Sequence, residues 1–397
     1  MLIKRRGFIQ TGSLATAALL LPKFMKAFES RTLVPAGNKA LVVIQLSGGN
    51  DGLNTVIPIT NDIYYRERPR LGITKDKANV LETDLGLHPE LTCLKSLYQE
   101  GNLAILNGVG YPNPDRSHFR SMDIWHSASG SQEYLSTGWL GRYLDAQCKG
   151  CDKPTQALEI DDVLSLALKG EEQKGLAFKD AGRLFTSSAE KYFKDISDNH
   201  KSTEETVDYL YKTMSATLSS SEYIYRQSML HPSAALYPAS QMGKSLKTIA
   251  SLILSDINTR VYYVSLGSFD THANQENQQN RLFKELNGAL EAFTNDLKKN
   301  NRFEDVLIMT FSEFGRRVKQ NASNGTDHGT ANNMFFMSGA LKKKGLLNPL
   351  PDLTNLIAGD LNLTVDFKSV YATVLKRWLD TDDRLILGKQ YELLDFI

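Results

Sequence analysis

Four continuous apolar runs constrain the fold of this chain more than any other feature of its sequence. They cover residues 40–46, 103–106, 261–266 and 306–311. Runs of β-branched, aliphatic and aromatic residues without polar alternation are typical of strands buried on both faces. Amphipathic helical patterns lie between these runs, so the sequence predicts an α/β fold, a sandwich with a central, mostly parallel sheet between helical layers.

The helical patterns and the polar stretches set the expected domain organisation. Apolar residues at helical spacing predict core helices over 242–254 and 279–298. The stretch at about 175–230 is more polar, and we expect it to form a helical insertion over the sheet. Residues 39–397 are therefore expected to form a single α/β domain, with the insertion as part of it.

The first 30 residues have the pattern of an export signal. Arg5 and Arg6 precede a short Ala/Leu-rich segment at 14–21, which is too short to span a bilayer as an ordinary transmembrane helix. The pattern resembles a twin-arginine signal, so we expect residues 1–30 to engage the twin-arginine translocation machinery and 31–38 to be a linker. The expected location is periplasmic or cell-envelope associated. The alternatives are a cytosolic chain with a chance arginine pair and a retained membrane anchor.

The charge balance argues against nucleic acid as a partner. The chain has 397 residues, with 46 Lys and Arg against 45 Asp and Glu, so its net charge is +1. A protein without a global basic field or a basic block lacks the electrostatic attraction that nucleic-acid binding needs.

Carboxylates and imidazoles lie at the ends of the predicted strands. Asp270 and His272 follow one run, Glu313 follows the next, His328 precedes a further apolar run at 334–337, and Asp51 follows the first. In a parallel sheet the loops at the carboxyl ends of the strands share one edge, so these side chains are expected to converge. They can bind one or two divalent ions, either zinc or an ion such as manganese, magnesium or calcium. Asp51 also has the alternative of a turn former in Asn-Asp-Gly.

Hydroxyl and guanidinium groups complete a candidate site. Ser117 follows the rigid loop Tyr111–Pro114 and is a candidate nucleophile, or alternatively a cap for the helix that begins near His118. Arg120, Arg316 and Arg317 are candidates for binding a tetrahedral anion. For Arg316 and Arg317 the alternative is a solvated face.

The motifs together resemble a bacterial exported family known as domain of unknown function 1501. The matching stretches run from the first strand to the last quarter of the chain and are 46–54, 117–119, 138–142, 269–272, 311–316 and 325–329. The family looks like a distant branch of the alkaline phosphatase and sulfatase superfamily. The resemblance implies an alkaline phosphatase-like fold. It also implies Ser117 as the nucleophile.

The same resemblance implies a ligand order along the chain. Asp51 would be the first metal ligand, Asp270 and His272 the next pair, Glu313 the following carboxylate and His328 the last ligand. Two departures stand out: the Asp-His pair is two residues apart instead of four, and Phe314 stands where a histidine would follow the carboxylate. One of two metal sites is therefore short of a ligand.

These observations support two expected functions. The first is an exported metal-dependent hydrolase of phosphate or sulfate esters, acting on a small molecule or a polysaccharide. The second is a non-catalytic exported binding or accessory protein that keeps the fold but has a degenerate metal site. Such a protein would bind partner proteins of the cell envelope. The complete set of Asp51, Ser117, Asp270, His272 and His328 favours the first, and Phe314 favours the second.

Overall fold

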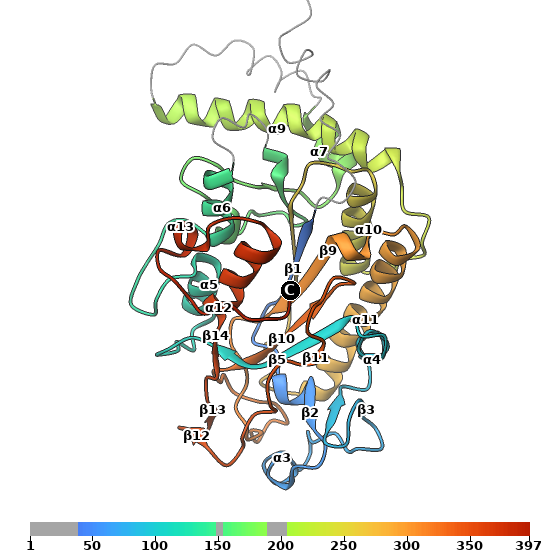
Figure 1. The fold of residues 1–397 in the computed structure, drawn as a ribbon, viewed down its shortest axis with the longest axis vertical. Coiled ribbons are helices and arrows are strands. Elements are labelled where there is room, and N and C mark those ends of the chain that lie inside the picture. Colours follow the sequence, from blue (N-terminus) through green and yellow to red (C-terminus); the bar gives the residue numbers. More distant parts are fainter. Residues whose placement is uncertain (1–38, 148–153, 189–204) are drawn as a thin grey trace, which may run out of the picture. The chain divides into compact units, whose positions relative to one another are not determined.

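A central sheet organises the protein in the computed structural model, which describes residues 39–147, 154–188 and 205–397. The expected signal and linker lie outside the described residues. The sheet has nine strands in the order β11-β5-β10-β9-β1-β8-β6-β7, with β14 also paired to β5 (Figure 1). Its strands are β1 (Ala40–Leu46), β5 (Leu103–Gly110), β6 (Ala157–Glu159), β7 (Leu176–Ala177), β8 (Val261–Leu266), β9 (Val306–Phe311), β10 (Asn332–Met337), β11 (Gly345–Leu346) and β14 (Val365–Asp366).

The sheet is parallel except at one strand. β1 lies between β8 and β9 and is parallel to both, with Ile44 opposite Val264 and Thr310. β10 is antiparallel to both of its neighbours, β9 and β5. The predicted α/β fold with a mostly parallel central sheet is confirmed, and the four apolar runs of the sequence are the buried strands β1, β5, β8 and β9.

Helices cover both faces of this sheet (Figure 1). On one face lie α4 (Thr92–Gln99), α10 (Gln241–Leu254) and α11 (Gln275–Lys299). On the other lie α5 (His118–Ser127), α6 (Trp139–Gln147), α12 (Phe367–Thr373) with the π-helical turn η5 (Val374–Trp378), and α13 (Asp383–Leu387). Because successive strand residues point to opposite faces, β1 contributes Val42 and Ile44 to one core and Leu41 and Val43 to the other.

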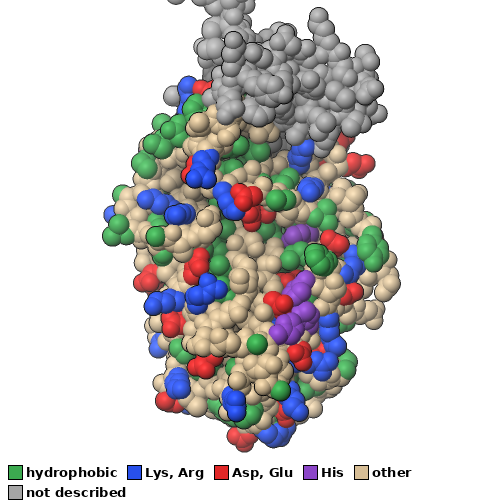
Figure 2. Space-filling view, turned by 180° about the vertical axis from the view of Figure 1, so that it is seen from behind, with side chains coloured by type: hydrophobic (Ala, Val, Ile, Leu, Met, Phe, Trp, Pro, Cys, Tyr) green, Lys and Arg blue, Asp and Glu red, His purple; other side chains and the backbone are tan. Residues whose placement is uncertain are grey.

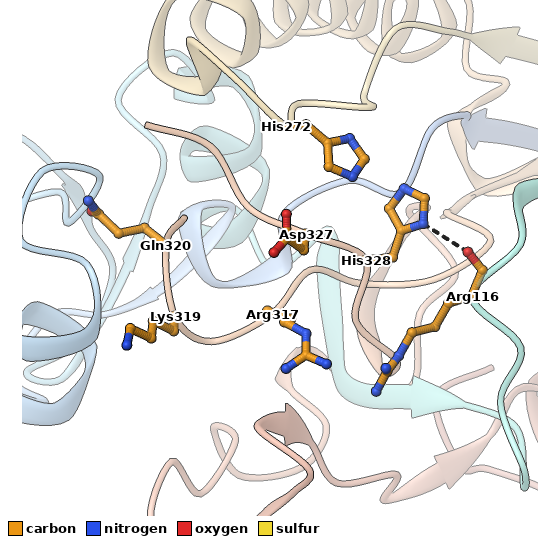
Figure 3. A pocket seen from close by; sticks show the side chains of 7 residues that line it. All are labelled: Arg116, His272, Arg317, Lys319, Gln320, Asp327 and His328. Carbon is orange, nitrogen blue, oxygen red and sulfur yellow. Dashed lines mark hydrogen bonds between the residues drawn. The ribbon is translucent and has the colours of Figure 1, made fainter. Parts of the chain in front are cut away.

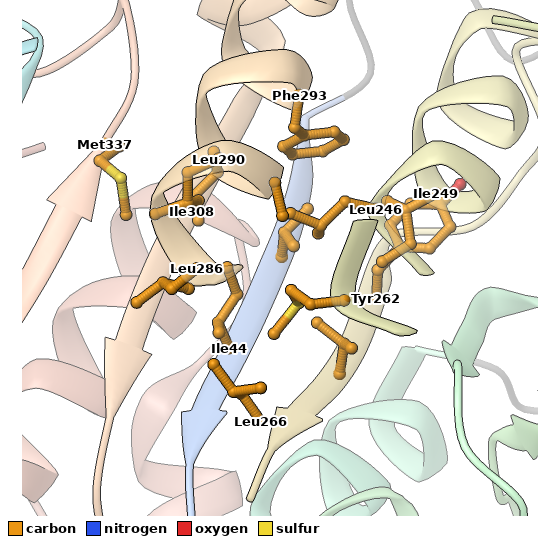
Figure 4. Packing of buried hydrophobic residues seen from close by; sticks show 14 of the residues in the cluster. Ile44, Leu246, Ile249, Tyr262, Leu266, Leu286, Leu290, Phe293, Ile308 and Met337 are labelled. Carbon is orange, nitrogen blue, oxygen red and sulfur yellow. The ribbon is translucent and has the colours of Figure 1, made fainter. Parts of the chain in front are cut away.

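The core under α10 and α11 is closely packed. Leu286, Leu290 and Phe293 of α11 meet Ile44 of β1 and Ile308 of β9 in one cluster of buried side chains (Figure 4). The i, i+4 and i+7 spacing on α11 is the apolar stripe that predicted this helix from the sequence. The two helical layers therefore hold the sheet, and its carboxyl edge, rigidly in place.

The remaining elements lie at the periphery. A small sheet of β2 (Val56–Pro58), β4 (Leu85–Leu87) and β3 (Asn79–Val80) and a pair β12 (Leu356–Ile357) and β13 (Asp360–Leu361) accompany α3 (Asp62–Glu67). The stretch expected as an insertion contains β7 at the sheet edge, α7 (Ala181–Ser188) and α9 (Glu205–Leu230). Short helical turns are η1 (Gly52–Asn54), η2 (Pro154–Gln156), η3 (Leu166–Leu168) and η4 (Phe303–Asp305). None of the helices in the described ranges combines the length and the apolar content needed to cross a bilayer.

Candidate metal centre

The loops at the carboxyl edge of the sheet bring the candidate ligands together. Asp270 follows β8 and Glu313 follows β9. The strands β8 and β9 lie on either side of β1. His328 precedes β10, and because β10 runs antiparallel, it begins at the edge where the parallel strands end. Histidine side chains gather on one face of the protein in the space-filling view (Figure 2).

Asp270 is the centre of this cluster. Its Oδ1 accepts from Nη2 of Arg316 at 2.6 Å and lies 2.8 Å from Nδ1 of His272 and 3.2 Å from Nε2 of His328. Its Oδ2 lies 3.5 Å from Nε2 of His118. Burial raises the pKa of Asp270, but the hydrogen bond and charge of Arg316 and the neighbouring histidines lower it to about 2. The carboxylate is therefore ionised across the physiological range.

Two histidines present the same ring nitrogen to this carboxylate. Nδ1 of His328 lies 2.8 Å from the carbonyl oxygen of Arg116, and Nδ1 of His118 lies 2.9 Å from Oε1 of Glu313. A carbonyl or carboxylate oxygen only accepts, so Nδ1 carries a proton in each ring, and Nε2 faces Asp270. Metal-binding histidines are held in this way, with the second nitrogen donating to a carboxylate or carbonyl.

These residues fit a divalent metal ion. One ligand atom from each of His118, Asp270 and His328 lies within 4.8 Å of the others, in the one such group among the described residues. Nε2 of His118 is buried and makes no hydrogen bond within the part of the chain that is described. When Nδ1 carries the proton, Nε2 of His328 directs a lone pair at Oδ1 of Asp270, and a cation between the two relieves that repulsion. Two imidazoles and a carboxylate are a donor set that zinc binds.

The buried Glu313 contacts the cluster through His118. Its side chain is fully buried, and Oε1 also accepts from the backbone N–H of Gly48 at 2.8 Å. The hydrogen bond to Glu313 raises the pKa of His118, with burial acting in the opposite direction and the charges of Glu313 and Asp270 adding to the rise. Glu313 thus contacts the group of candidate ligands through its hydrogen bond with His118, whose ring it would orient toward a bound ion.

A close approach of two backbones places Asp270. Gly48 has φ +116°, and a Cβ atom there would lie 2.5 Å from the backbone nitrogen of Asp270. Only glycine adopts that φ readily and leaves room for the loop after β8. The loop after β1 therefore contacts Asp270 through its backbone and Glu313 through the N–H of Gly48.

An open, basic pocket of about 530 Å³ adjoins the histidines (Figure 3). It is lined by Arg116, His272, Arg317, Lys319, Gln320, Asp327 and His328. His272 and His328 lie side by side in the close view, and the guanidinium groups of Arg116 and Arg317 extend to one side of them. With three cationic side chains and one carboxylate, the pocket is suited to an anion.

Ser117 is exposed beside this cluster. It precedes His118 at the start of α5, in the N-cap position, and its hydroxyl makes no capping hydrogen bond in the structure as described. The capping alternative therefore has no bond to support it. The neighbouring carbonyl of Arg116 receives the N–H of His328, so both residues that flank Ser117 belong to the site.

The contacts of Asp51 differ from those expected of a metal ligand, because both carboxylate oxygens have partners outside the histidine cluster. Its Oδ2 pairs with Nη1 of Arg68 at 2.5 Å and accepts from Nε2 of Gln275 at 2.5 Å, while Oδ1 accepts from the N–H of Leu53. Asp51 and Arg68 are both almost fully buried. These contacts match the turn-former alternative, with an ion pair that compensates the buried charge.

The three candidate arginines differ in their surroundings. Arg120 is buried and donates to the carbonyl oxygens of Gly130, Ser131 and Glu133, so its guanidinium holds a loop. Arg316 is fully buried and binds backbone carbonyls as well as Asp270. Arg317 is about one-third exposed and lines the basic pocket. Only Arg317 has the access expected of an anion-binding arginine.

Three site residues were not singled out from the sequence. His118 stood within the matching stretch 117–119, directly after the candidate nucleophile, and that position was its signal. Arg116 and Lys319 carry no signal in the sequence, because a surface cation looks the same whether or not it borders a pocket.

Several solved structures show distant similarity to the chain. PsFucS1 sulfatase from Pseudoalteromonas sp. has 12% identity and a TM-score of 0.41, with 94% of this chain and 72% of that chain covered. The phosphonate monoester hydrolase SpPMH from Silicibacter pomeroyi has 7% identity and a TM-score of 0.40, covering 89% and 78%. The C-terminal periplasmic domain of EcEptC from Escherichia coli, in complex with Zn, has 9% identity and a TM-score of 0.36, covering 77% and 74%. Similarity of this degree carries no inference about the reaction.

The sequence itself gives the firmer assignment. No curated protein matches the chain significantly. A family described as "Protein of unknown function (DUF1501)" matches residues 104–348, which contain Ser117, His118, Asp270, Glu313 and His328. The match covers well over half of the chain, and the protein therefore belongs to the DUF1501 family.

Proposed function

We propose that the protein is an exported metal-dependent hydrolase of phosphate or sulfate esters. The observation that carries this proposal is the convergence of His118, Asp270 and His328, whose Nε2 and carboxylate atoms face one another while Glu313 and a carbonyl hold the opposite ring nitrogens. A preorganised donor set next to an anion-binding pocket and an exposed hydroxyl is the minimum that such a reaction requires.

The chain's own residues divide the work of holding an ion. His118, His328 and Asp270 would bind it, and His272 is within reach through its contact with Asp270. A bound divalent ion supplies positive charge that stabilises the transition state and favours ionisation of a nearby hydroxyl. Glu313 orients His118, and the buried Arg316 orients Asp270, so both act on the ion through its ligands.

Ser117 is proposed as the nucleophile. Its Oγ would attack the phosphorus or sulfur atom, the bond to the alcohol oxygen would break, and the alcohol would leave with a proton. Water would then hydrolyse the serine ester and regenerate the hydroxyl. Arg317 and Lys319 would attract the tetrahedral anion, because both lie in the wall of the basic pocket.

Turnover of a panel of phosphate and sulfate esters by the purified protein tests this proposal. We expect activity that is lost on treatment with a chelator and restored by zinc or manganese. Ser117→Ala should abolish turnover with an unchanged melting temperature, because its hydroxyl makes no capping bond. Ser96→Ala, which changes an exposed serine of α4, is the matched control. Full activity in Ser117→Ala, or hydrolysis that survives metal removal, would contradict the proposal.

A non-catalytic binding role is the second candidate function. Two observations favour it: Phe314 stands where the superfamily pattern has a histidine, and both oxygens of Asp51 are occupied by Arg68, Gln275 and Leu53. A protein with this role would bind a metal or an anion and turn over no ester in the panel. The same assay therefore decides between the two functions.

Export by the twin-arginine route is part of the proposal and rests on residues 1–30, outside the described structure. Changing Arg5→Lys together with Arg6→Lys should leave the protein in the cytoplasm, as measured by cell fractionation. Unchanged export of this variant would rule out the twin-arginine assignment.

A further inference from the structure

A second pocket, different in character, borders the histidine cluster. It has a volume of about 240 Å³ and mostly apolar walls, formed by residues such as Tyr111, Pro112, Phe314, Ala331 and Leu363. A cavity of about 150 Å³ with apolar walls is large enough to hold benzene. The pocket therefore has room for a substituted or bicyclic aromatic ring.

Phe314 separates this pocket from the candidate metal centre. Its ring lines the pocket, and the ring centroids of His118 and His328 lie 4.9 Å and 4.6 Å away from its own. Phe314 is almost fully buried. The residue that replaces a histidine in the superfamily pattern thus forms an apolar wall directly against two candidate ligands.

Arg116 joins the two pockets. It lines both the basic pocket and the apolar pocket, and its carbonyl oxygen fixes His328. Its guanidinium pairs with Asp360. A molecule whose anionic group lies among Arg317 and Lys319 can therefore extend past Arg116 into the apolar space.

Asp360 contributes a polar acceptor to this mostly apolar pocket. Its side chain is almost fully buried, and Oδ1 has no hydrogen-bond partner among the described residues. Nε of Arg317 lies 3.9 Å from Oδ1 of Asp360, close enough for the two charges to attract but too far for a hydrogen bond. A buried carboxylate oxygen left without a donor favours a ligand that supplies one.

We propose that the apolar pocket binds the alcohol part of the ester, and that this part is an aromatic ring carrying a second hydroxyl or amino group that donates to Asp360. This inference rests on the proposed hydrolase function and specifies its substrate class as aryl esters. The apolar walls at Phe314, Ala331 and Leu363 disfavour a polysaccharide in this position, because its hydroxyl groups would lose water without gaining partners.

Binding of 2-naphthol, the alcohol of an aryl ester, tests the pocket by calorimetry without any need for turnover. The full chain should bind it, and Leu363→Asp should weaken binding at least tenfold by placing a charge in the wall. Leu385→Asp is the matched control, since Leu385 is an exposed leucine of α13 that does not line the pocket. Failure of the unaltered chain to bind 2-naphthol would overturn the inference.

A second variant, Gly110→Val, tests the same pocket if Leu363→Asp does not fold. Gly110 lines the pocket, and a Cβ atom there would have its nearest neighbour at 3.4 Å, so a side chain enters the pocket without a severe clash. Gly110→Val should therefore also lower the affinity for 2-naphthol at least tenfold while the protein remains folded. Unchanged affinity in Gly110→Val would place the ligand elsewhere and contradict the inference.

The role of Asp360 is tested by a ligand pair. We expect 2,6-dihydroxynaphthalene to bind about tenfold more tightly than 2-naphthol, because its second hydroxyl can donate to a carboxylate. Equal affinities would remove Asp360 from the binding site.

Turnover separates this inference from the function on which it rests. Hydrolysis of 2-naphthyl and methyl esters with equal kcat/KM, without 2-naphthol binding, would overturn the aryl subsite and leave the hydrolase standing. Binding of 2-naphthol without hydrolysis of any ester would overturn the hydrolase, and with it the assignment of the occupant as an ester's alcohol. A preference of at least tenfold for the naphthyl esters that disappears in Gly110→Val would support both.

Discussion

At the scale of single residues, the charges near the carboxyl edge separate into a structural pair and a functional cluster. Asp51 and Arg68 neutralise each other in a nearly fully buried ion pair. Asp270 instead is almost half exposed and faces three imidazoles. Burial with a dedicated partner indicates structure, whereas exposure among convergent donors indicates a site.

This distinction predicts the behaviour of Asp51→Asn. The change leaves the buried Arg68 without its counter-ion, and breaking a buried pair costs about 3–5 kcal/mol in the free energy of unfolding. Metal affinity should be unchanged, because the described contacts of Asp51 include none of the cluster residues. Urea unfolding and metal titration measure the two effects, with the exposed Asp84→Asn as control. Loss of metal with little loss of stability would instead make Asp51 a ligand.

The sequence predicted the location of the cluster but only part of its chemistry. Asp270 and Glu313 were predictable because polar residues that follow buried parallel strands share one edge of the sheet. His328 was predicted at the same edge, but it precedes its strand, and the antiparallel direction of β10 is what brings it there. His118 was not singled out, because its role depends on the position of α5 relative to a sheet edge formed by distant residues. The pairing of Asp51 with Arg68 has no local signature, since the two residues are brought together by the fold.

At the scale of elements, the antiparallel strand β10 completes the site. Strand direction is not encoded in an apolar run, so the antiparallel pairing of β10 with β5 and β9 could not be predicted from its residues. The reversal places the start of β10, and His328 before it, at the edge where β8 and β9 end. A parallel strand in this position would carry His328 to the opposite edge.

The loop after β1 gives a prediction at the same scale. Gly48→Ala introduces a side chain at φ +116° and 2.5 Å from the backbone nitrogen of Asp270, so the loop must move. We expect lower stability and a loss of metal affinity of about 10- to 100-fold, as for other disturbances of groups that orient ligands. Calorimetric metal titration measures the affinity.

Gly267→Ala is the matched control for this loop. Gly267 lies between β8 and Asp270, but a Cβ atom there meets nothing within 4 Å. Its metal affinity should equal that of the unaltered chain. Equal affinities in Gly48→Ala and Gly267→Ala would show that the close approach at Gly48 does not position Asp270.

At the scale of the whole molecule, Glu159 makes stability depend on pH. Burial raises its pKa from 4.5 to about 7, with the hydrogen bonds from Ser165 lowering it, Asp161 raising it and Lys169 lowering it. The folded protein therefore keeps a proton that the unfolded chain releases between pH 4.5 and 7. Stability falls as the pH rises through this window, by on the order of 3 kcal/mol in total.

Comparison with Glu159→Gln isolates this effect. Burial lowers the pKa of His88 and His126 to about 4. These two histidines therefore have the opposite effect: they reduce the stability of the protein as the pH falls from 6.5 to 4. Between pH 4.5 and pH 8 the unaltered chain should lose stability that the variant keeps. The free energy of unfolding of the variant should therefore rise relative to that of the unaltered chain by on the order of 3 kcal/mol. Urea unfolding at both pH values measures it, and a difference that does not change with pH would contradict the assignment.

The central claim is that His118, Asp270 and His328 form a metal centre, and elemental analysis of the purified protein tests it most directly. We expect a stoichiometric divalent ion in the unaltered chain. We expect its loss in His118→Ala and in His328→Ala, each of which removes one of the converging nitrogens. His231→Ala, which alters an exposed histidine outside the cluster, should keep the ion. A protein that holds no divalent ion after exposure to zinc, or that keeps its ion in both His118→Ala and His328→Ala, would contradict the account.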